Sequence, residues 1–505
     1  MPTDKRTPSR HTEVERKFAV VEGTVAPSFE GLSAVTRVQR TPAQRLDAVY
    51  FDTPGQDLAA HRVTLRRRTG GPDAGWHLKL PAGADARTEV RLPLGGADAP
   101  DYVVPEELRD VVLAIVRDRP LRPVATISTT RIVDLLYGPD DAVVAEFCDD
   151  IVRASAESDG PPQEWREWEL ELAEGVAADP GAALLDRLAN RLLDAGAEPA
   201  GHGSKLAKVL SATAPKPPPR SKDPVHRAVA EQVDELLVWD RAVRADAWDA
   251  VHQMRVVTRK IRSLLRGSEA SFGISDDSLL LTELKELAGI LGVARDAEVL
   301  AEKYADALDG LPEELVRGPV RERLVEGAKR RYHAGWKRTL VALRSERYFR
   351  MLDALDAVIA TAPQPSQDGG DAGQVTVGAA YARVRKAAKK ADAAAADDAV
   401  SDRDADEALH KIRKRAKQLR YTASALGEPK VAESAKSIQS LLGDHQDSVV
   451  SRTHLSSEAL AAHAAGEDTF TYGVLYQLES EVARRSEELL GEALKQLKKS
   501  VRAAT

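Results

Sequence analysis

The stretch TEVERKF at residues 12–18 places Glu13, Glu15 and Lys17 at a strict spacing of two residues. Successive side chains of a β-strand point to opposite faces, so a strand here would carry all three on one face. Two carboxylates and an ammonium group on one face suit a site that holds a divalent metal and an anion together. A strand whose charged face is merely solvated explains the same spacing, and the rest of the chain bears on that choice.

The composition indicates a soluble protein of several domains. At 505 residues the chain is too long for one core, so two or three domains are expected. The net charge of -7 excludes a uniformly basic nucleic-acid coat protein but not local basic patches. The only cysteine, Cys148, excludes an internal disulfide and a site of several thiolates, in keeping with a reducing cytoplasm.

The start of the chain lacks the apolar segment of a secretory signal, and no later run approaches the length of a membrane span. We therefore expect residues 1–10 to form a short disordered tail. The expected location is cytoplasmic, without a membrane partner.

Residues 11–172 alternate between polar and apolar side chains in about eight segments, separated by Gly, Pro and Asp as antiparallel hairpins require. Eight alternating strands favour a closed barrel with a polar interior. A Pro-rich linker follows at residues 213–224, and helical periodicity dominates beyond it. The predicted fold class is a multidomain α+β protein, with an eight-stranded antiparallel β-tunnel and flanking helices at residues 11–212 and an all-α domain at residues 225–500.

The all-α region looks duplicated. Two motifs recur in the same order at nearly equal offsets, and a Pro- and Gly-containing break at residues 361–373 separates the copies. We predict two pseudo-repeated helical bundles at about residues 225–360 and 374–500. The matches are VHQMRVVTRKIRSLL from Val251 with LHKIRKRAKQLRYTA from Leu409, and LAGILGVARDAEVL from Leu287 with IQSLLGDHQDSVVS from Ile438.

Several predicted strands carry charge at consecutive positions on one face and apolar residues on the other. In GWHLKL, His77 and Lys79 lie opposite Trp76 and Leu78. An open sheet with a wet polar face is the alternative to a closed barrel, although such a face would mix Thr, Ser and Gln with scattered charges. The other sets on one face are Arg66 with Arg68, Arg87 with Glu89 and Arg91, Glu146 with Cys148 and Asp150, and Glu169 with Glu171.

If these charged faces turn inward, they form a cationic channel for a polyphosphate chain beside an oxygen-ligand site for Mg²⁺ or Mn²⁺. Burying so many charges is tolerable only where they balance one another and face a wet cavity that holds a ligand. Such a metal would polarise a terminal phosphate and orient a water molecule, and the arginines would stabilise charge on the phosphoryl group. The predicted cations are Arg66, Arg68, Lys79, Arg91 and Arg131, and the predicted metal ligands are Glu13, Glu15, Glu169 and Glu171.

Across residues 11–210 these motifs resemble the CYTH domain of the triphosphate tunnel metalloenzymes. The resemblance implies an eight-stranded tunnel that binds a linear triphosphate or a nucleoside triphosphate, with acidic residues on the metal and basic residues on the phosphates. Members include inorganic triphosphatases, thiamine triphosphatases and class IV adenylate cyclases. The motifs that carry it are TEVERKF, LRRR at 65–68, HLKLP at 77–81, R-x-E-x-R at 87–91, TTR at 129–131, ELE at 169–171 and SKLAKVL at 204–210.

On this resemblance Glu13, Glu15 and Lys17 are the predicted catalytic residues, and Lys205 joins the cations that bind substrate. The chain departs from the family pattern after AEFCDDIV, where a glycine is usual, so Glu146 and Asp150 receive less weight as site residues. Lys208 stands where an arginine is commoner.

Helices in both halves of the all-α region would carry a basic wedge opposite an apolar stripe. A solvated basic face is the ordinary explanation for one such helix. A row of like charges at i,i+3 and i,i+4 repels itself, however, unless an anion binds, and here it occurs twice. The wedges contain His252, Arg255, Arg259, Arg262 and Arg266 in the first copy, and His410, Arg413, Lys417 and Arg420 in the second.

Residues 222–500 resemble the CHAD domain, a helical module named for its conserved histidines. The resemblance implies two pseudo-symmetric four-helix bundles whose basic faces bind inorganic polyphosphate, with no catalytic chemistry. One histidine per helix without a nearby carboxylate or thiolate is poor spacing for a metal, so we expect His252 and His410 to contact phosphate.

Together the two halves predict a divalent-metal-dependent triphosphatase, a phosphoric anhydride hydrolase acting on inorganic triphosphate. Inorganic polyphosphate is its predicted partner, and polyphosphate granules are a predicted place of association. One alternative is a non-catalytic polyphosphate-binding protein, and another is a class IV-type adenylate cyclase, for which no sequence feature marks an adenine pocket. Nucleic acid is disfavoured as a partner because aromatic residues make up only 5% of the chain.

Overall fold

The protein is described here from a computed structural model. The structure describes residues 8–83, 85–95, 102–157, 161–176, 178–213, 221–267, 272–275, 277–361, 376–395, 397 and 401–504. Most of the predicted tail, linker and inter-repeat break lies outside these ranges. By contacts, the chain separates into two compact units, Met1–Lys285 with Leu340–Pro363, and Glu286–Thr339 with Gln364–Thr505.

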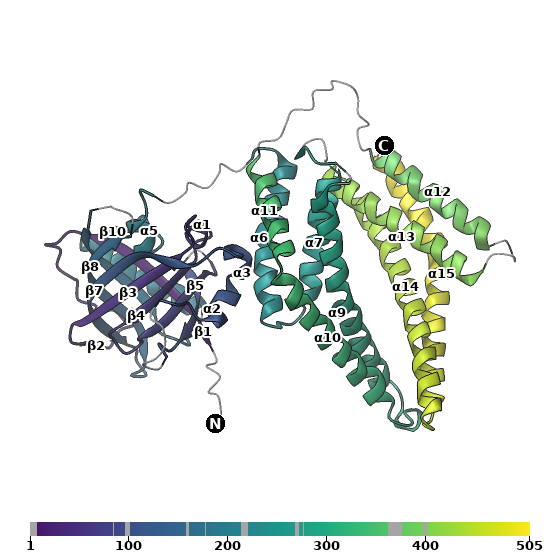
Figure 1. The fold of residues 1–505 in the computed structure, drawn as a ribbon, viewed down its shortest axis with the longest axis horizontal. Helices are drawn as coiled ribbons and strands as arrows, with labels where there is room; N and C mark the ends of the chain where they lie inside the picture. Colours follow the sequence, from purple (N-terminus) through teal and green to yellow (C-terminus); the bar gives the residue numbers. More distant parts are fainter. Residues whose placement is uncertain are drawn as a thin grey trace, which may run out of the picture. The chain divides into compact units, whose positions relative to one another are not determined.

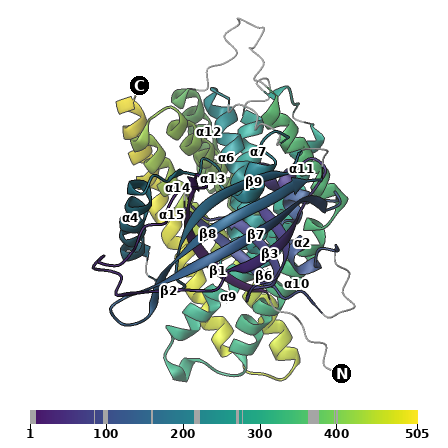
Figure 2. The same ribbon diagram turned by 90° about the vertical axis from the view of Figure 1, so that its left-hand side faces the viewer.

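Eight antiparallel strands of the first unit close into a barrel, as predicted (Figures 1 and 2). Strand β1 (Ser9–Val20) pairs with β6 (Ala86–Leu92) along one part of its length and with β9 (Gln163–Leu172) along the other, which closes the ring. Because β1 starts at Ser9, the ordered strand begins two residues inside the predicted tail. The remaining strands run in the order β5 (Gly75–Pro81), β4 (Thr64–Thr69), β3 (Gln44–Asp52), β7 (Arg122–Tyr137) and β8 (Val143–Ala156) between β6 and β9.

Two short strands extend this sheet. Strand β2 (Arg37–Arg40) pairs with β7, and β10 (Glu198–Pro199) pairs with β1. Three short helices, α1 (Asp57–Ala60), α2 (Glu106–Val111) and α3 (Leu113–Val116), lie in the connections between strands.

Helix α4 (Ala178–Asp194) covers an apolar part of the barrel's outer face and lies beside the strands in Figure 2. Leucines of α4, such as Leu185 and Leu188, pack against Phe18 of β1 and Trp168 of β9. These two aromatic residues are sequence neighbours of Lys17 and Glu169. Strand alternation therefore turns the charged neighbours toward the barrel interior.

Helix α5 (Lys205–Val209) covers one end of that interior. The Ser204 side chain caps the helix by accepting a hydrogen bond from the backbone N–H of Ala207. Leu206 and Val209 of α5 pack against apolar barrel residues that include Tyr50. The same helix thus introduces Lys205 into the barrel from its end.

The first unit also holds helices α6 (Pro224–Arg244), α7 (Ala250–Gly267) and α11 (Glu346–Ala360). Arg117, at the end of α3, is only 5% exposed, and its guanidinium donates to Asp353 and Asp356, one turn apart on α11. This buried arginine ties the barrel to a helix that follows it by more than 200 residues.

Long helices build the second unit, and two of them, α9 (Leu279–Asp309) and α10 (Gly327–Leu343), also contribute residues to the first. One core lies among α12, α13, α14 and α15, and another joins α9, α14 and α15. Within the part of the chain that the structure describes, no helix combines the length and the apolarity needed to cross a membrane. The bounds are α12 Val377–Ala395, α13 Asp402–Ala425, α14 Pro429–Ala464 and α15 Phe470–Ala504, with the single turns η1 Glu313–Leu315 and η2 Glu322–Glu326.

Candidate active site

The charged face of β1 lines the barrel interior. In the register between β1 and β9, Glu15 lies opposite Glu171 and Lys17 lies opposite Glu169. The Lys17 ammonium donates to Glu15 at 2.7 Å and also pairs with Glu169. The charged side chains of TEVERKF therefore form ion pairs inside the barrel and do not lie on a solvated edge.

A first group of charges surrounds Lys205. Its ammonium nitrogen lies 2.8 Å from a carboxylate oxygen of each of Asp150, Glu167 and Glu169. The Arg131 guanidinium donates to both oxygens of Asp150, at 2.7 and 2.6 Å, and reaches Glu169 as well. Burial alone would raise the pKa of Asp150, but Arg131 and Lys205 outweigh it and lower that pKa below its ordinary value. The Asp150 carboxylate is therefore stabilised in its ionised form by these two cations.

A second group is built on Glu13 and Glu89, which are 3% and 0% exposed. Lys79 pairs with Glu13 and lies 3.7 Å from Glu89, while Arg91 pairs with Glu89 and lies 3.2 Å from Glu13. His77 completes the group, with Nδ1 2.9 Å from Glu89. Each carboxylate thus shares both cations with the other.

Between these groups, Glu15 and Glu171 face each other on β1 and β9. Burial raises the pKa of Glu171 to about 7, and the charges of Glu13, Glu15 and Glu169 add to this effect, while Lys79 opposes it. The negative charges of these four buried carboxylates repel one another. A bound divalent cation would offset that repulsion.

Arg66 and Arg68 of β4 supply further positive charge. Arg66 donates to the Tyr50 hydroxyl at 3.3 Å. Burial would raise the pKa of Tyr50, but the Arg66 charge outweighs it and lowers that pKa. Burial lowers the pKa of Arg68 to about 9, and the charges of Arg66 and Arg131 add to the effect. Several cations lie together here, although Arg68 already pairs with Asp73. Such a cluster of cations suits a place that receives an anion.

The structure brings every predicted tunnel residue into these neighbouring groups. It also adds Asp150, Glu167, Glu89, His77 and His11, which were not among the predicted site residues. Asp150, which received less weight in the prediction, has its carboxylate fully buried against Arg131 and Lys205. A signal for Glu167 was available, since it extends the period-two series of Glu169 and Glu171 by one step.

The donor sets fit a divalent metal. Two groups of three side chains place ligand atoms within 4.8 Å of one another, His11 with Glu13 and Glu89, and Asp150 with Glu167 and Glu169. Carboxylate oxygens are the ligands that Mg²⁺ and Mn²⁺ prefer. Of the predicted ligands, Glu13 belongs to one group and Glu169 to the other. Glu15 and Glu171 complete the acidic lining between them.

In the helical region the predicted apolar stripes are buried. Ile261 of α7 and Ile412 of α13 both lie in cores. On the basic wedges, Arg262 donates to the backbone carbonyl of Leu281 at 3.1 Å, and Arg420 donates to the Gln439 side chain at 3.2 Å. The two wedge helices belong to different units, α7 to the first and α13 to the second.

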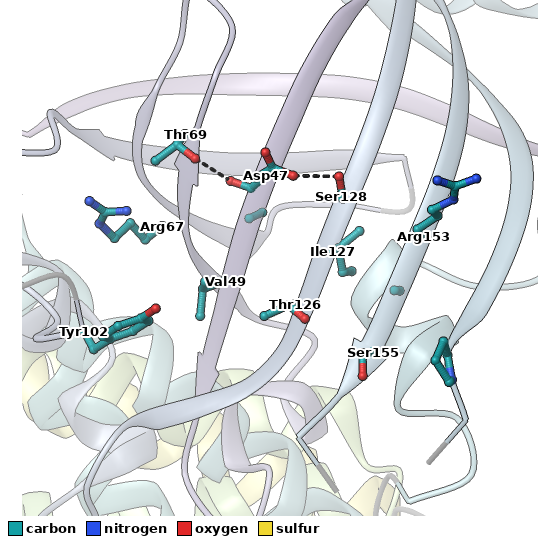
Figure 3. Close-up of a pocket in the computed structure, with 13 residues that line it drawn as sticks. Asp47, Val49, Arg67, Thr69, Tyr102, Thr126, Ile127, Ser128, Arg153 and Ser155 are labelled. Atoms are coloured by element: carbon teal, nitrogen blue, oxygen red, sulfur yellow. Dashed lines mark hydrogen bonds between the residues drawn. The ribbon is translucent and has the colours of Figure 1, made fainter. Parts of the chain in front are cut away.

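Figure 3 shows a pocket on the outer wall of the barrel, on the face opposite to the charges described above. Asp47 lies at its centre and accepts a hydrogen bond from Ser128 at 2.6 Å. Arg67, the strand neighbour of Arg66 and Arg68, points to this side. Polar side chains such as Thr126 and Arg153 line the pocket beside apolar ones such as Val49 and Ile127, a mixture that is usual for the outer face of a barrel.

Comparison with known proteins identifies both halves of the chain. Residues 11–192 match the model of the CYTH domain, and residues 227–456 match that of the CHAD domain. Two proteins of Mycobacterium tuberculosis, "Uncharacterized protein Rv2226" of strain ATCC 25618 / H37Rv and "Uncharacterized protein MT2285" of strain CDC 1551 / Oshkosh, are each 60% identical over all of both chains.

Among solved structures, PptA from Streptomyces chartreusis is similar over 55% of this chain and 99% of its own, with 19% identity and a TM-score of 0.41. The CHAD domain from Ricinus communis covers 54% of this chain and 90% of its own, with 20% identity and a TM-score of 0.41. A putative adenylyl cyclase from Hippeastrum, whose title reports a dominant triphosphatase activity, covers 40% of this chain and 95% of its own, with 15% identity and a TM-score of 0.25. By its two domain matches and its full-length relatives, the chain belongs to the family of proteins that join an N-terminal CYTH domain to a C-terminal CHAD domain.

Proposed function

We propose that the tunnel domain hydrolyses inorganic triphosphate with the help of a divalent metal, Mg²⁺ or Mn²⁺. The observation that supports this most is the closed barrel interior in which buried carboxylates alternate with lysines and arginines. A metal-bound triphosphate carries both signs of charge, so it can replace such internal ion pairs with its own. An uncharged ligand could not compensate these buried charges if it displaced their ion pairs.

The proposed roles follow from the charge of each group. Glu13, Glu15, Glu169 and Glu171 would hold the metal, which when bound polarises a phosphoryl group and lowers the pKa of a water molecule. Arg66, Arg68, Lys79, Arg91, Arg131 and Lys205 would hold the phosphate oxygens and stabilise charge at the phosphorus atom under attack. Lys17 pairs with Glu15 and Glu169, two of the proposed metal ligands. Its ammonium group would therefore lie beside both the metal and the phosphate groups bound to it.

The test is phosphate release from inorganic triphosphate, thiamine triphosphate and ATP, each with Mg²⁺ or Mn²⁺. The double variant Glu13→Ala with Glu15→Ala should lose activity by a factor of about 100 or more, a typical effect of removing groups that act on the transition state. Glu22→Ala, an exposed glutamate just beyond β1, is the matched control. If the wild-type protein turns over none of the three substrates, the tunnel binds without cleaving and the proposal fails. Release of pyrophosphate from ATP with cyclic AMP as product would mark a cyclase instead.

We further propose that the basic wedges of α7 and α13 bind inorganic polyphosphate. The supporting observation is that each helix buries its apolar stripe and leaves a row of cations on another face. Long phosphate chains bind such rows by charge and by bidentate contacts with arginine. The residues proposed to carry this binding are His252, Arg255, Arg259, Arg262, His410, Arg413, Lys417 and Arg420.

Retention of the full-length protein on immobilised polyphosphate tests this second proposal. Charge reversal at Arg413 and Lys417 should weaken retention and reduce its salt dependence. Reversal at Lys411 and Arg415 changes the total charge equally on another face of the same helix. Equal effects of the two double variants would show that α13 acts through net charge alone, and the wedge proposal would then be wrong.

A further inference from the structure

His11 is the third residue of β1. It lies directly opposite Glu89 in the register between β1 and β6, and on the same face as Glu13. Its Nε2 atom is 3.1 Å from Glu89 Oε2 and 3.5 Å from Glu13 Oε1. This nitrogen is buried, yet among the described residues it makes no hydrogen bond.

This geometry resembles a set of metal ligands more than an ion pair. A protonated imidazole this close to two carboxylates would normally direct its N–H at one of them. Ligands bound about 2.1 Å from a common ion stand about 3.0 Å apart at right angles and about 3.4 Å apart in a tetrahedron. The separations of 3.1 and 3.5 Å lie close to this range.

His77 contacts the Glu89 carboxylate on the side away from His11. Its Nδ1 lies 2.9 Å from Glu89 Oε1, the oxygen that does not face His11, and its Nε2 lies 2.9 Å from the Asp73 carbonyl. A partner that fixes one carboxylate oxygen leaves the other oriented for a ligand. Such supporting contacts are typical of metal sites.

A cation already bridges the two oxygens that His11 approaches. The Arg91 guanidinium pairs with Glu89 Oε2 through Nε and lies 3.2 Å from Glu13 Oε1 through Nη2. Lys79 pairs with the other oxygen of Glu13, Oε2. The Arg91 side chain is 37% exposed, so it can leave these carboxylates for a phosphate more easily than the buried groups around it. Its departure would leave Glu13, Glu89 and His11 facing one another with one positive charge fewer.

We propose that His11, Glu13 and Glu89 form a divalent cation site containing one nitrogen ligand, distinct from the Asp150, Glu167 and Glu169 group. The site fills when Arg91 transfers to a phosphate group. A mixed set of one imidazole and two carboxylates favours Mn²⁺, Co²⁺ or Zn²⁺ over Mg²⁺, because nitrogen ligands suit these borderline ions better. This inference rests on the proposed function, in that it assigns an ion and its selectivity to the same tunnel.

Pulsed electron paramagnetic resonance of Mn²⁺ added to the full-length protein together with a non-hydrolysable triphosphate analogue, which supplies the phosphate groups for Arg91, tests the inference directly. The wild-type protein should show modulation from a coordinated histidine nitrogen, and His11→Gln should abolish it. His202→Gln is the matched control, because His202 is a tunnel histidine 3.9 Å from Glu167, beside the other carboxylate group. Absence of nitrogen coupling in the wild-type protein, its persistence in His11→Gln, or failure to bind Mn²⁺ would each overturn the inference.

Equilibrium titration gives a second measurement. With the same triphosphate analogue present, His11→Gln should weaken Mn²⁺ and Co²⁺ binding by about 10-fold or more, and Mg²⁺ binding much less. Arg91→Ala should instead strengthen Mn²⁺ binding in the absence of any phosphate, because it removes the competing cation. Weaker binding in Arg91→Ala would contradict the exchange of Arg91 for an ion.

Phosphate release with Mg²⁺, measured on the same preparation, separates this inference from the proposed function. Turnover without nitrogen coupling overturns the inference and leaves the function intact. Nitrogen coupling that depends on His11, without turnover of any triphosphate, supports the inference and overturns the function.

Discussion

Lys17 and Glu169 are register partners on the first and last strands of the barrel, and their side chains form an ion pair across the seam where the barrel closes. Burial would lower the pKa of Lys17, but Glu15 and Glu169 outweigh it and raise that pKa above its ordinary value. The contact that closes the fold therefore also fixes a charged residue of the candidate site. Changes to the charged lining should for this reason alter stability as well as ligand binding.

Replacement of Lys205 by methionine should destabilise the metal-free protein strongly. The change leaves Asp150, Glu167 and Glu169 with one cation fewer in a buried space. Breaking a buried ion pair from one side costs about 3–5 kcal/mol. Urea unfolding at neutral pH measures the change, and Lys208→Met, on the same helix with its ammonium over the Trp165 ring, is the control. A loss no larger than that of the control would show that Lys205 is not needed to balance these acids.

Glu171 should make the stability of the metal-free protein depend on pH. Its folded pKa of about 7 lies above its ordinary value of 4.5, mainly because the carboxyl is buried. The stability it contributes is therefore complete below pH 4.5 and is lost as the pH rises through about 7. We expect Glu171→Gln to flatten the fall in unfolding free energy over this range, measured by urea unfolding with a chelator present.

The exposed Glu164, on the same strand, supplies the control variant Glu164→Gln. Addition of Mg²⁺ should also reduce the slope, since a bound cation favours the ionised carboxylate. A wild-type slope of opposite sign would contradict the raised pKa.

Arg117→Ala should loosen the attachment of α11 to the barrel. The buried guanidinium pairs with both Asp353 and Asp356, and its loss leaves two carboxylates without that partner. Hydrogen exchange of the α11 backbone should become faster, while exchange in the barrel strands stays the same. The double change Arg117→Asp with Asp353→Arg should restore part of the protection. Unchanged exchange in α11 would show that other contacts hold this helix.

Ile412→Ala should destabilise the second unit. Ile412 is a fully packed residue of the core formed by α12, α13, α14 and α15. Removal of a buried isoleucine side chain beyond Cβ costs about 2–5 kcal/mol. Lys411→Ala, at the next position and exposed, should cost less than about 0.5 kcal/mol. A circular-dichroism melt that distinguishes neither variant from the wild type would contradict the assigned helix face.

Much of this site could be predicted because strand alternation is a local rule. The faces of Glu13, Glu15 and Lys17 follow from their spacing alone. Glu89 could be assigned to a face in the same way, but its central place depends on His11 and His77, which neighbouring strands supply. His11 itself stands at the border between the predicted tail and the strand. Its role becomes visible only when β6 is placed beside β1.

The helical half shows the same limit. Amphipathic spacing predicted which face of α7 and α13 would be buried, since that property belongs to one helix. The grouping of helices does not follow from such spacing. Contacts assign residues 286–339 to the unit that holds 364–505, and α9 and α10 run across the boundary between units. The two pseudo-repeated helical bundles at about residues 225–360 and 374–500 stay a prediction.

The pairing of β1 with β9 has a consequence during synthesis. The strand made first can complete its pairing only with a strand that ends at Leu172, so a growing chain holds β1 with part of its edge unpaired until β9 has left the ribosome. Contacts between segments so far apart in sequence form slowly, and unpaired edges invite association with other chains. The many charges on β1 counter that hazard, because an edge that carries glutamates and lysine pairs poorly with a copy of itself. Residues proposed to serve a phosphate ligand in the finished tunnel would thus also keep the nascent chain from aggregating.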